Sequence, residues 1–224
     1  KRERPDRRCV TNYSDDTGWY RAGQRRLAQH VKQQGIEFCP YEALPPGCLH
    51  THTDRPYAFK PFCVLDAAAK TGRALVLWMD SSAVPHANLQ PIFDVMEKHG
   101  AFISANFGWR CEQWTTPEQW TILGLDRKKY GVFEHCSAAV CGFDLEHPVG
   151  KALLDEWAHY ANHTLAFVGP REINPPVDQC LGTRWDQTVL SLLAHKRGIP
   201  FQHNDRFVTY GKDSSGIVRL YPCQ

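Results

Sequence analysis

Residues 74–79 (ALVLWM) form the strongest strand pattern in this chain of 224 residues. A strand with one face in water alternates apolar and polar side chains, whereas a strand covered on both faces is apolar throughout. The stretch therefore predicts a central strand in a sheet that has helices on both faces. Asp80, Ser81 and Ser82 follow it directly, so the strand delivers one carboxylate and two hydroxyls to its carboxyl end.

Strand and helix patterns alternate along the rest of the chain. We expect strands at 9–13, 36–39, 74–79, 101–106, 137–143 and 199–202, and helices at 18–34, 57–70, 88–99, 148–162 and 185–196, with a further helix starting near 115. Repeated strand–helix units build a mainly parallel, twisted sheet, so the predicted fold class is α/β, of the Rossmann-like kind. The length suits one domain, which we place at 9–224, after a basic tail or trimmed linker at 1–8.

Three polar features are candidates for a site, because ligands of such sheets lie at the carboxyl ends of the strands. Asp80 is the first, although Asp and Ser also cap ordinary turns. Asp186 and Gln187 at the start of a helix are the second, although the helix dipole by itself favours an acid there. His50 and His52 match the His-x-His metal pair of several hydrolases, but they follow Pro-Pro-Gly-Cys instead of an apolar strand.

Charge, hydropathy and missing motifs argue against several classes of protein. The net charge is +2, of which residues 1–8 contribute +3 (five bases, two acids), so the body is nearly neutral and unlike a nucleic-acid-binding surface. No apolar run reaches the roughly 20 residues of a membrane span. The sequence lacks G-x-G-x-x-G after the first strand, G-x4-G-K-[ST] and G-x-S-x-G, which argues against common dinucleotide folds, phosphate loops and serine hydrolases.

Cysteines and glycosylation sequons bear on the cellular compartment. Nine cysteines without a C-x2-C pair are either buried free thiols or, in an oxidising compartment, a few disulfides and one leftover thiol. Two sequons, at Asn12 and Asn162, favour the oxidising compartment. We therefore expect the secretory pathway, with the cytoplasm as the alternative.

Four stretches, taken in order, carry a resemblance to a known family. They are residues 57–62 (YAFKPF), 76–82 (VLWMDSS), 139–143 (AVCGF) with Glu156-Trp157 in the helix that follows, and 184–190 (RWDQTVL). Together they resemble the nucleotide-sugar glycosyltransferases of the GT-A fold over about residues 10–201. The resemblance implies transfer of a hexose or pentose from a nucleotide-diphosphate sugar to a hydroxyl of a glycan or glycoprotein acceptor, in the Golgi lumen.

The resemblance also implies a divalent cation, Mn²⁺ or Mg²⁺. In that family a strand ending in Asp-x-Asp holds the cation, which neutralises the departing diphosphate. Asp80 matches the first carboxylate, Ser82 stands at the second, and His203 matches the position of a late metal-ligating histidine. Because a hydroxyl is a weaker ligand for these cations than a carboxylate, metal dependence stays open.

Further roles follow from the same resemblance. The donor would contact Thr11, Asn12, Tyr13, Lys60, Asp80, Ser81 and Ser82, and basic side chains at Lys60, Arg55 and Arg171 would hold the diphosphate if no metal does. In the family, residues at the end of the strand 139–143 border the acceptor, which implies contacts with Phe143 and Asp144. Trp109 and Trp114 lie in a loop after a predicted strand, where they either stack on an acceptor sugar or pack within the loop. Asp186 and Gln187 match the pair that faces the transferred sugar, and we expect them to be catalytic.

Two rival functions remain beside the transferase. One is a sugar- or nucleotide-binding module of the same fold in which Asp-x-Asp has decayed to Asp-Ser-Ser and catalysis is lost. The other is a metal-dependent hydrolase built on His50 and His52. For each of the three we expect neither a nucleic-acid partner nor a membrane span in this chain.

Overall fold

The computed structural model describes residues 6–15, 18–203, 206–211 and 216–221. Its helices are α1 (Gly18–Gln33), α2 (Phe59–Thr71), α3 (Gln90–His99), the short 3-10 helix η1 (Cys111–Gln113), α4 (Pro117–Leu123), α5 (Arg127–Tyr130), α6 (Pro148–His163) and α7 (Asp186–Lys196). Its strands are β1 (Arg8–Tyr13), β2 (Glu37–Tyr41), β3 (Leu75–Met79), β4 (Ala83–Pro85), β5 (Ala101–Arg110), β6 (Glu134–Asp144), β7 (Phe201–Gln202), β8 (Val208–Tyr210) and β9 (Val218–Leu220). The predicted alternation of strands and helices is confirmed, with shifted boundaries.

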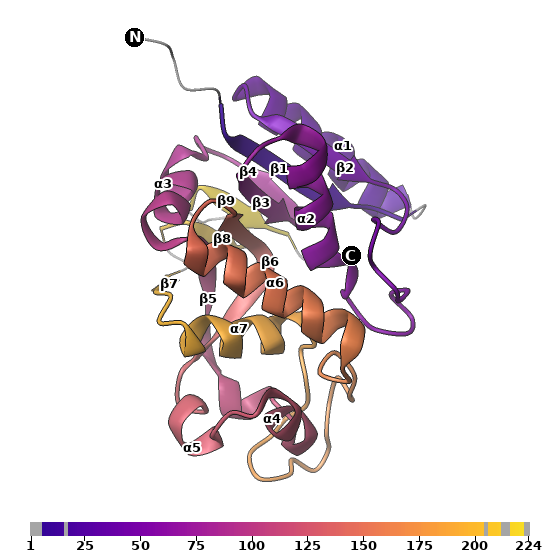
Figure 1. Cartoon of the computed structure of the whole chain (residues 1–224), viewed down its shortest axis with the longest axis vertical. Coiled ribbons are helices and arrows are strands. Elements are labelled where there is room, and N and C mark those ends of the chain that lie inside the picture. The colour runs from indigo at the N-terminus through magenta and orange to yellow at the C-terminus, as the bar shows by residue number, and fades with distance from the viewer. Residues whose placement is uncertain (1–5, 16–17, 204–205, 212–215, 222–224) are drawn as a thin grey trace.

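Six strands form the central sheet in the order β2-β1-β3-β6-β5-β7 (Figure 1). The pairs β1–β2, β1–β3 and β5–β7 are parallel, whereas β6 runs antiparallel to both of its neighbours. Helices α4 and α5 lie beyond the end of β5, so the chain returns as β6 without crossing a face of the sheet. The mainly parallel α/β sheet is therefore confirmed, with one reversed strand.

Two hydrophobic cores lie on the two faces of this sheet. One gathers α2, α6 and α7 and includes Val76 and Trp78 of β3, while the other gathers α1 and α3 and includes Leu75, Leu77 and Met79. Successive side chains of a strand point to opposite faces, so β3 feeds both cores in alternation. All five of its residues are buried, which explains why the strand has no polar side chain.

The sequence patterns miss a second sheet, with the strand order β4-β9-β8. Each of its strands has only three residues, too few for an alternating pattern to stand out. The sheet packs on the core of α1 and α3 through Val208 and Val218. Its Tyr210 hydroxyl donates to Ser137 Oγ of β6 over 2.8 Å, which ties the C-terminal part of the chain to the central sheet.

The folded part begins earlier than we predict from the sequence. Arg8 is the first residue of β1 and pairs with Leu75 of β3. Arg7 forms an ion pair with Asp144 over 3.0 Å. The predicted tail of residues 1–8 therefore contributes its last residues to the sheet, and its residues 1–5 lie outside the described part of the chain.

The described residues give no support to the disulfides and glycans that we predict. All eight described cysteines are free thiols, and Cys223 lies outside the described residues. Asn12 Nδ2 donates to the Met79 carbonyl over 2.6 Å and Asn162 Nδ2 to the Gly47 carbonyl over 2.7 Å. Both residues are buried, so neither amide is accessible for a glycan. Within the same described ranges, no helix has the length and apolar character that a membrane crossing requires.

Candidate active site

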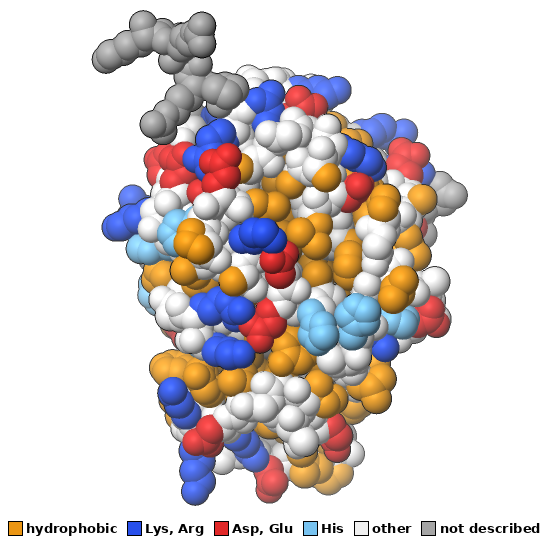
Figure 2. Space-filling view, in the orientation of Figure 1, with side chains coloured by type: hydrophobic (Ala, Val, Ile, Leu, Met, Phe, Trp, Pro, Cys, Tyr) orange, Lys and Arg blue, Asp and Glu red, His pale blue; other side chains and the backbone are white. Residues whose placement is uncertain are grey.

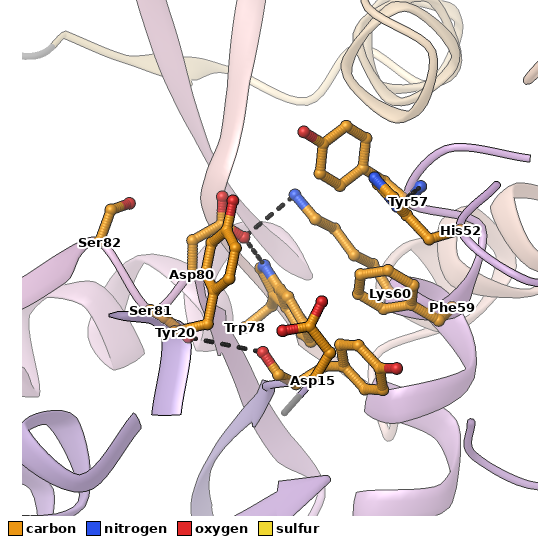
Figure 3. A pocket seen from close by; sticks show the side chains of 11 residues that line it. Asp15, Tyr20, His52, Tyr57, Phe59, Lys60, Trp78, Asp80, Ser81 and Ser82 are labelled. Carbon is orange, nitrogen blue, oxygen red and sulfur yellow. Dashed lines mark hydrogen bonds and ion pairs between the residues drawn. The ribbon is translucent and has the colours of Figure 1, made fainter. Parts of the chain in front are cut away.

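A cavity of about 270 Å³ opens at the carboxyl ends of β1 and β3 (Figure 3). This is the edge at which sheets of this kind bind their ligands. Its lining includes five of the predicted donor-binding residues, Tyr13, Lys60, Asp80, Ser81 and Ser82. Six further residues complete the lining and were not predicted as donor-binding: Asp15, Tyr20, His52, Tyr57, Phe59 and Trp78.

Asp80 points into this cavity and not back to its own turn (Figure 3). Its Oδ1 accepts a hydrogen bond from Trp78 Nε1 over 2.7 Å and lies 3.1 Å from Lys60 Nζ. The side chain keeps 29% of its surface exposed. The backbone closes the turn after β3 instead, because the Ala83 N–H donates to the Asp80 carbonyl. The alternative interpretation of Asp80 as a turn cap is therefore wrong.

Lys60 is a buried cation between two carboxylates. Its Nζ lies 2.8 Å from Asp186 Oδ2 and 3.1 Å from Asp80 Oδ1, and it donates to the Ala138 carbonyl over 3.0 Å. Burial by itself lowers the pKa of a lysine, but the charges of Asp186 and Asp80 outweigh it and raise the pKa of Lys60 above its ordinary value. Lys60 is therefore protonated. Because its Nζ already contacts three protein acceptors, it is not free to bind a diphosphate as predicted.

Asp186, the first residue of α7, lies beneath this cation and does not line the cavity. Only 3% of its side chain is exposed. Burial raises the pKa of Asp186 to about 6, and the charge of Lys60 opposes that rise. The predicted catalytic carboxylate therefore reaches the cavity only through Lys60.

Gln187 faces the sheet instead of the cavity. Its Oε1 accepts from the Ala138 N–H over 3.3 Å, and its backbone carbonyl accepts from Ser191 Oγ over 2.6 Å. The bond to Ala138 and the ion pair of Asp186 with Lys60 fasten the start of α7 to β6 and α2. The predicted pair lies next to the cavity without lining it.

The end of β1 presents one side chain to the cavity. Thr11 and Asn12 are fully buried, and Thr11 Oγ1 donates to the Cys39 carbonyl of β2 over 2.8 Å. Tyr13 lines the cavity, and its ring centroid lies 4.4 Å from that of Phe59. Of the three donor-binding residues predicted on β1, only Tyr13 is placed to contact a ligand.

A close approach of α1 to Ser81 explains how Tyr20 enters the site. A Cβ atom on Gly23 would lie 2.2 Å from the Ser81 carbonyl oxygen, so only glycine permits this packing. Residues three apart share one face of a helix, and Tyr20 therefore lies on the side of α1 that faces the cavity. The unusual Gly23 within a helix pattern is the one sequence signal for this contact.

Phe143 and Asp144 lie at the wrong edge of the sheet for the acceptor role that we predict. Asp144 pairs with Leu75, the first residue of β3, whereas Asp80 follows the last one. The prediction assumes that β6 runs parallel to β3, and its antiparallel direction carries its last residues to the opposite edge. Phe143 is fully buried in the core there.

Trp109 and Trp114 pack on each other outside the cavity. Their ring centroids are 4.5 Å apart, and the guanidinium of Arg184 lies 3.7 Å from the Trp114 ring centroid. Trp114 keeps only 8% of its surface exposed. Acceptor binding by this pair stays a prediction. Arg171, the third candidate for the diphosphate, is exposed and does not line the cavity either.

The predicted cation ligands do not come together. Asp80 already contacts Lys60 and Trp78, and Ser82 offers only a hydroxyl. His203 follows β7, which is separated from β3 by β6 and β5; three strand spacings amount to about 14 Å. Among the residues that the structure describes, no three His, Cys, Asp or Glu side chains are grouped to hold a metal ion. These residues therefore do not fit the predicted cation site.

The residues of the predicted His-x-His pair have separate partners. His50 Nε2 lies 3.0 Å from the Asn162 carbonyl at the end of α6, and Arg55 donates to that same carbonyl over 2.7 Å. Both side chains thus satisfy a helix C-terminus, and Arg55 is not free to hold a diphosphate. His52 lines the cavity, where its Nδ1 accepts from the Tyr57 N–H over 3.1 Å. The two rings form no joint metal site.

No protein-family model matches this sequence, and no curated protein matches it. Its fold matches solved structures over nearly their whole length. A glycosyltransferase involved in the glycosylation of the major capsid of PBCV-1 aligns with a TM-score of 0.57 and 14% identity, covering 95% of this chain and 94% of that one. The apo form of mouse xyloside xylosyltransferase 1 aligns with a TM-score of 0.51 and 9% identity, covering 96% and 98%.

The chain has a GT-A-type fold. At 14% and 9% identity this likeness concerns the path of the backbone. Asp80 and the cavity of this GT-A-type chain lie where open α/β sheets bind ligands, at the carboxyl ends of adjacent strands. A fold alone does not determine chemistry, which depends on the side chains that line the cavity.

Proposed function

We propose that this chain is a glycosyltransferase that moves a hexose or pentose from a nucleotide-diphosphate sugar to a hydroxyl of a glycan or glycoprotein. One observation carries the proposal. A carboxylate at the end of the central strand of a GT-A-type fold, Asp80, opens into a cavity of about 270 Å³. Aromatic walls with a few polar groups are typical of small-molecule sites, and this cavity has that character.

The nucleotide occupies the end of the cavity near β1 in this proposal. Tyr13 and Tyr20 supply aromatic surface for a base, and Asp15 supplies an acceptor for hydroxyl groups. Asp80 commits its Oδ1 to Trp78 and Lys60, so its second oxygen accepts from a hydroxyl of the ribose or the sugar. The charge of Lys60 holds Asp80 and Asp186 in place. Asp186 does not touch the ligand; it positions Lys60, which in turn positions Asp80.

His52 contributes a neutral hydrogen-bond donor. Burial, and then the charge of Lys60, lower the pKa of His52 below its ordinary value, so the ring is neutral at neutral pH. Its Nδ1 accepts from the Tyr57 N–H, which leaves the proton on Nε2. In the proposed reaction this Nε2–H donates to the departing diphosphate, whose negative charge grows as the sugar leaves.

On the face drawn in Figure 2, the described side chains do not have the charge pattern of a nucleic-acid-binding surface. Basic and acidic side chains are interspersed on the face that α2, α6 and α7 form, without a continuous basic stripe (Figure 2). Nucleic-acid-binding proteins carry such a stripe.

Thermal unfolding in the presence of UDP, GDP, ADP and CDP tests the proposal, because a ligand that binds only the native state raises the melting temperature. We expect one of the four to raise it in the wild type and in Asp155→Ala, whose carboxylate is exposed on α6, but not in Asp80→Ala. The matching nucleotide sugar should then release its diphosphate slowly in water. Binding without release favours the non-catalytic module, and silence toward all four contradicts the proposal.

A further inference from the structure

Two aromatic residues beside the ion pair have strained backbones. Tyr57 has φ +63° and Trp185 has φ +43° with ψ −102°. A bulky side chain rarely adopts a positive φ, and such backbone strain persists only where the surrounding structure enforces it. The two rings are neighbours, with their centroids 6.0 Å apart.

Hydrogen bonds hold both residues in these conformations. The Tyr57 N–H donates to His52 Nδ1 over 3.1 Å. The Trp185 N–H donates to Thr183 Oγ1, and its indole Nε1 donates to the Gly169 carbonyl, each over 3.0 Å. Both side chains remain partly exposed. The structure therefore keeps two aromatic faces near the surface at a cost in backbone energy.

These two rings continue the aromatic lining of the cavity. Ring contacts lead from Tyr13 to Phe59 (4.4 Å), from Phe59 to Tyr57 (6.4 Å) and from Tyr57 to Trp185 (6.0 Å). The row thus begins at the end of β1 and ends at the start of α7. Lys60 lies beside its middle, with Nζ 4.9 Å from the Tyr57 ring centroid.

We propose that Tyr57 and Trp185 form a stacking platform for the sugar ring of the acceptor. The inference rests on the proposed function, which places the nucleotide at the Tyr13 end of the row and leaves the Trp185 end for the acceptor. A pyranose ring has one face lined by C–H groups, and partly exposed aromatic rings bury such apolar surface. The platform adjoins Asp186 and Lys60, so the acceptor hydroxyl approaches the donor beside this ion pair.

Fluorine NMR of protein labelled with 5-fluorotryptophan tests the platform directly in the wild type. Methyl glycosides of glucose, galactose, mannose and xylose serve as probes, with UDP or the nucleotide that binds best present throughout. Trp185→Phe identifies the Trp185 resonance by its loss. We expect at least one glycoside to shift that resonance in a saturable way. A shift confined to other tryptophans, or no shift with any glycoside, overturns the inference.

Substitutions provide the second measurement. Tyr57→Ala should weaken the binding of the effective glycoside at least tenfold, whereas Tyr57→Phe and Phe107→Ala should leave it within twofold; Phe107 is 81% exposed and does not line the cavity. Nucleotide affinity should change less than threefold in Phe107→Ala. Equal glycoside affinity in Tyr57→Ala and the wild type overturns the platform but leaves the nucleotide site intact. If the wild type binds none of the nucleotides, the proposed function itself is contradicted.

Discussion

Replacing Lys60 by methionine gives the sharpest test of the buried ion pair. Methionine keeps most of the length and apolar volume of the lysine stem but removes its charge. Asp186, with 3% of its side chain exposed, then loses its cation at 2.8 Å. Asp80 loses a contact of 3.1 Å but remains 29% exposed, so water solvates its charge. The loss in the free energy of unfolding therefore comes mainly from the buried, unpaired charge of Asp186.

The size and the pH dependence of this penalty follow from burial. Removing one partner of a buried ion pair costs about 3–5 kcal/mol. Burial already raises the pKa of Asp186 to about 6 against the charge of Lys60, so the substitution raises it further. A carboxyl group with a raised folded-state pKa adds stability at low pH that is lost as pH rises through that pKa. Lys60→Met should therefore be least destabilised near pH 5, where Asp186 binds a proton, and most destabilised near pH 8.

Urea unfolding followed by tryptophan fluorescence measures the free energy of unfolding of the wild type and of each variant at about pH 5 and about pH 8. The double variant Lys60→Met/Asp186→Asn removes both charges and should be more stable near pH 8 than Lys60→Met alone. Coupling between two residues in contact appears as this departure from additivity. A loss below about 1 kcal/mol at both pH values, or a double variant whose loss equals the sum of the single ones, would refute the reasoning.

Three further predictions concern other parts of the molecule. Asp80→Ala should lower turnover of the nucleotide sugar about 100-fold or more, about 2.7 kcal/mol in barrier, and a folded variant with less than a threefold loss would remove Asp80 from the site. Ser82→Asp supplies a second carboxylate at the strand end, so Mn²⁺ affinity measured by calorimetry should rise at least tenfold over the wild type; an unchanged affinity contradicts this placement. Asn162→Ala removes hydrogen bonds to the loop carbonyl of Gly47 and the N–H of Leu49 and should cost about 1–3 kcal/mol in urea unfolding, whereas wild-type stability would show that the loop does not depend on them.

Patterns that act over a few residues predicted the fold well. The apolar stretch at 74–79 forms β3. Both faces of this strand pack in apolar cores, so a polar side chain on either face would be buried without a partner. The end of that strand also determined where Asp80 lies. The short strands of the second sheet carried no such pattern and were missed.

The residues of a strand do not by themselves determine whether it runs parallel or antiparallel to its neighbours. An apolar strand pairs in either direction, and the helices before β6 lie beyond the end of the sheet instead of across its face. The assumption of a parallel β6 therefore misplaced Phe143 and Asp144. Trp109 and Trp114 were likewise chosen from their loop position. Tyr57 and Trp185 belong to two of the stretches that carry the family resemblance, but neither was predicted to bind the acceptor, and only the fold brings their rings together.

Short-range periodicity and chain order thus sufficed for the α/β class, the central strand and the carboxylate at its end, since each depends on neighbouring residues. Tertiary packing alone decided that Lys60 is held between Asp80 and Asp186. Those three side chains come from distant segments, and the pKa of each buried group depends on charges that meet only after folding. Lys60, predicted to bind a diphosphate, is instead buried in an internal ion pair. No local sequence pattern predicts burial of this kind.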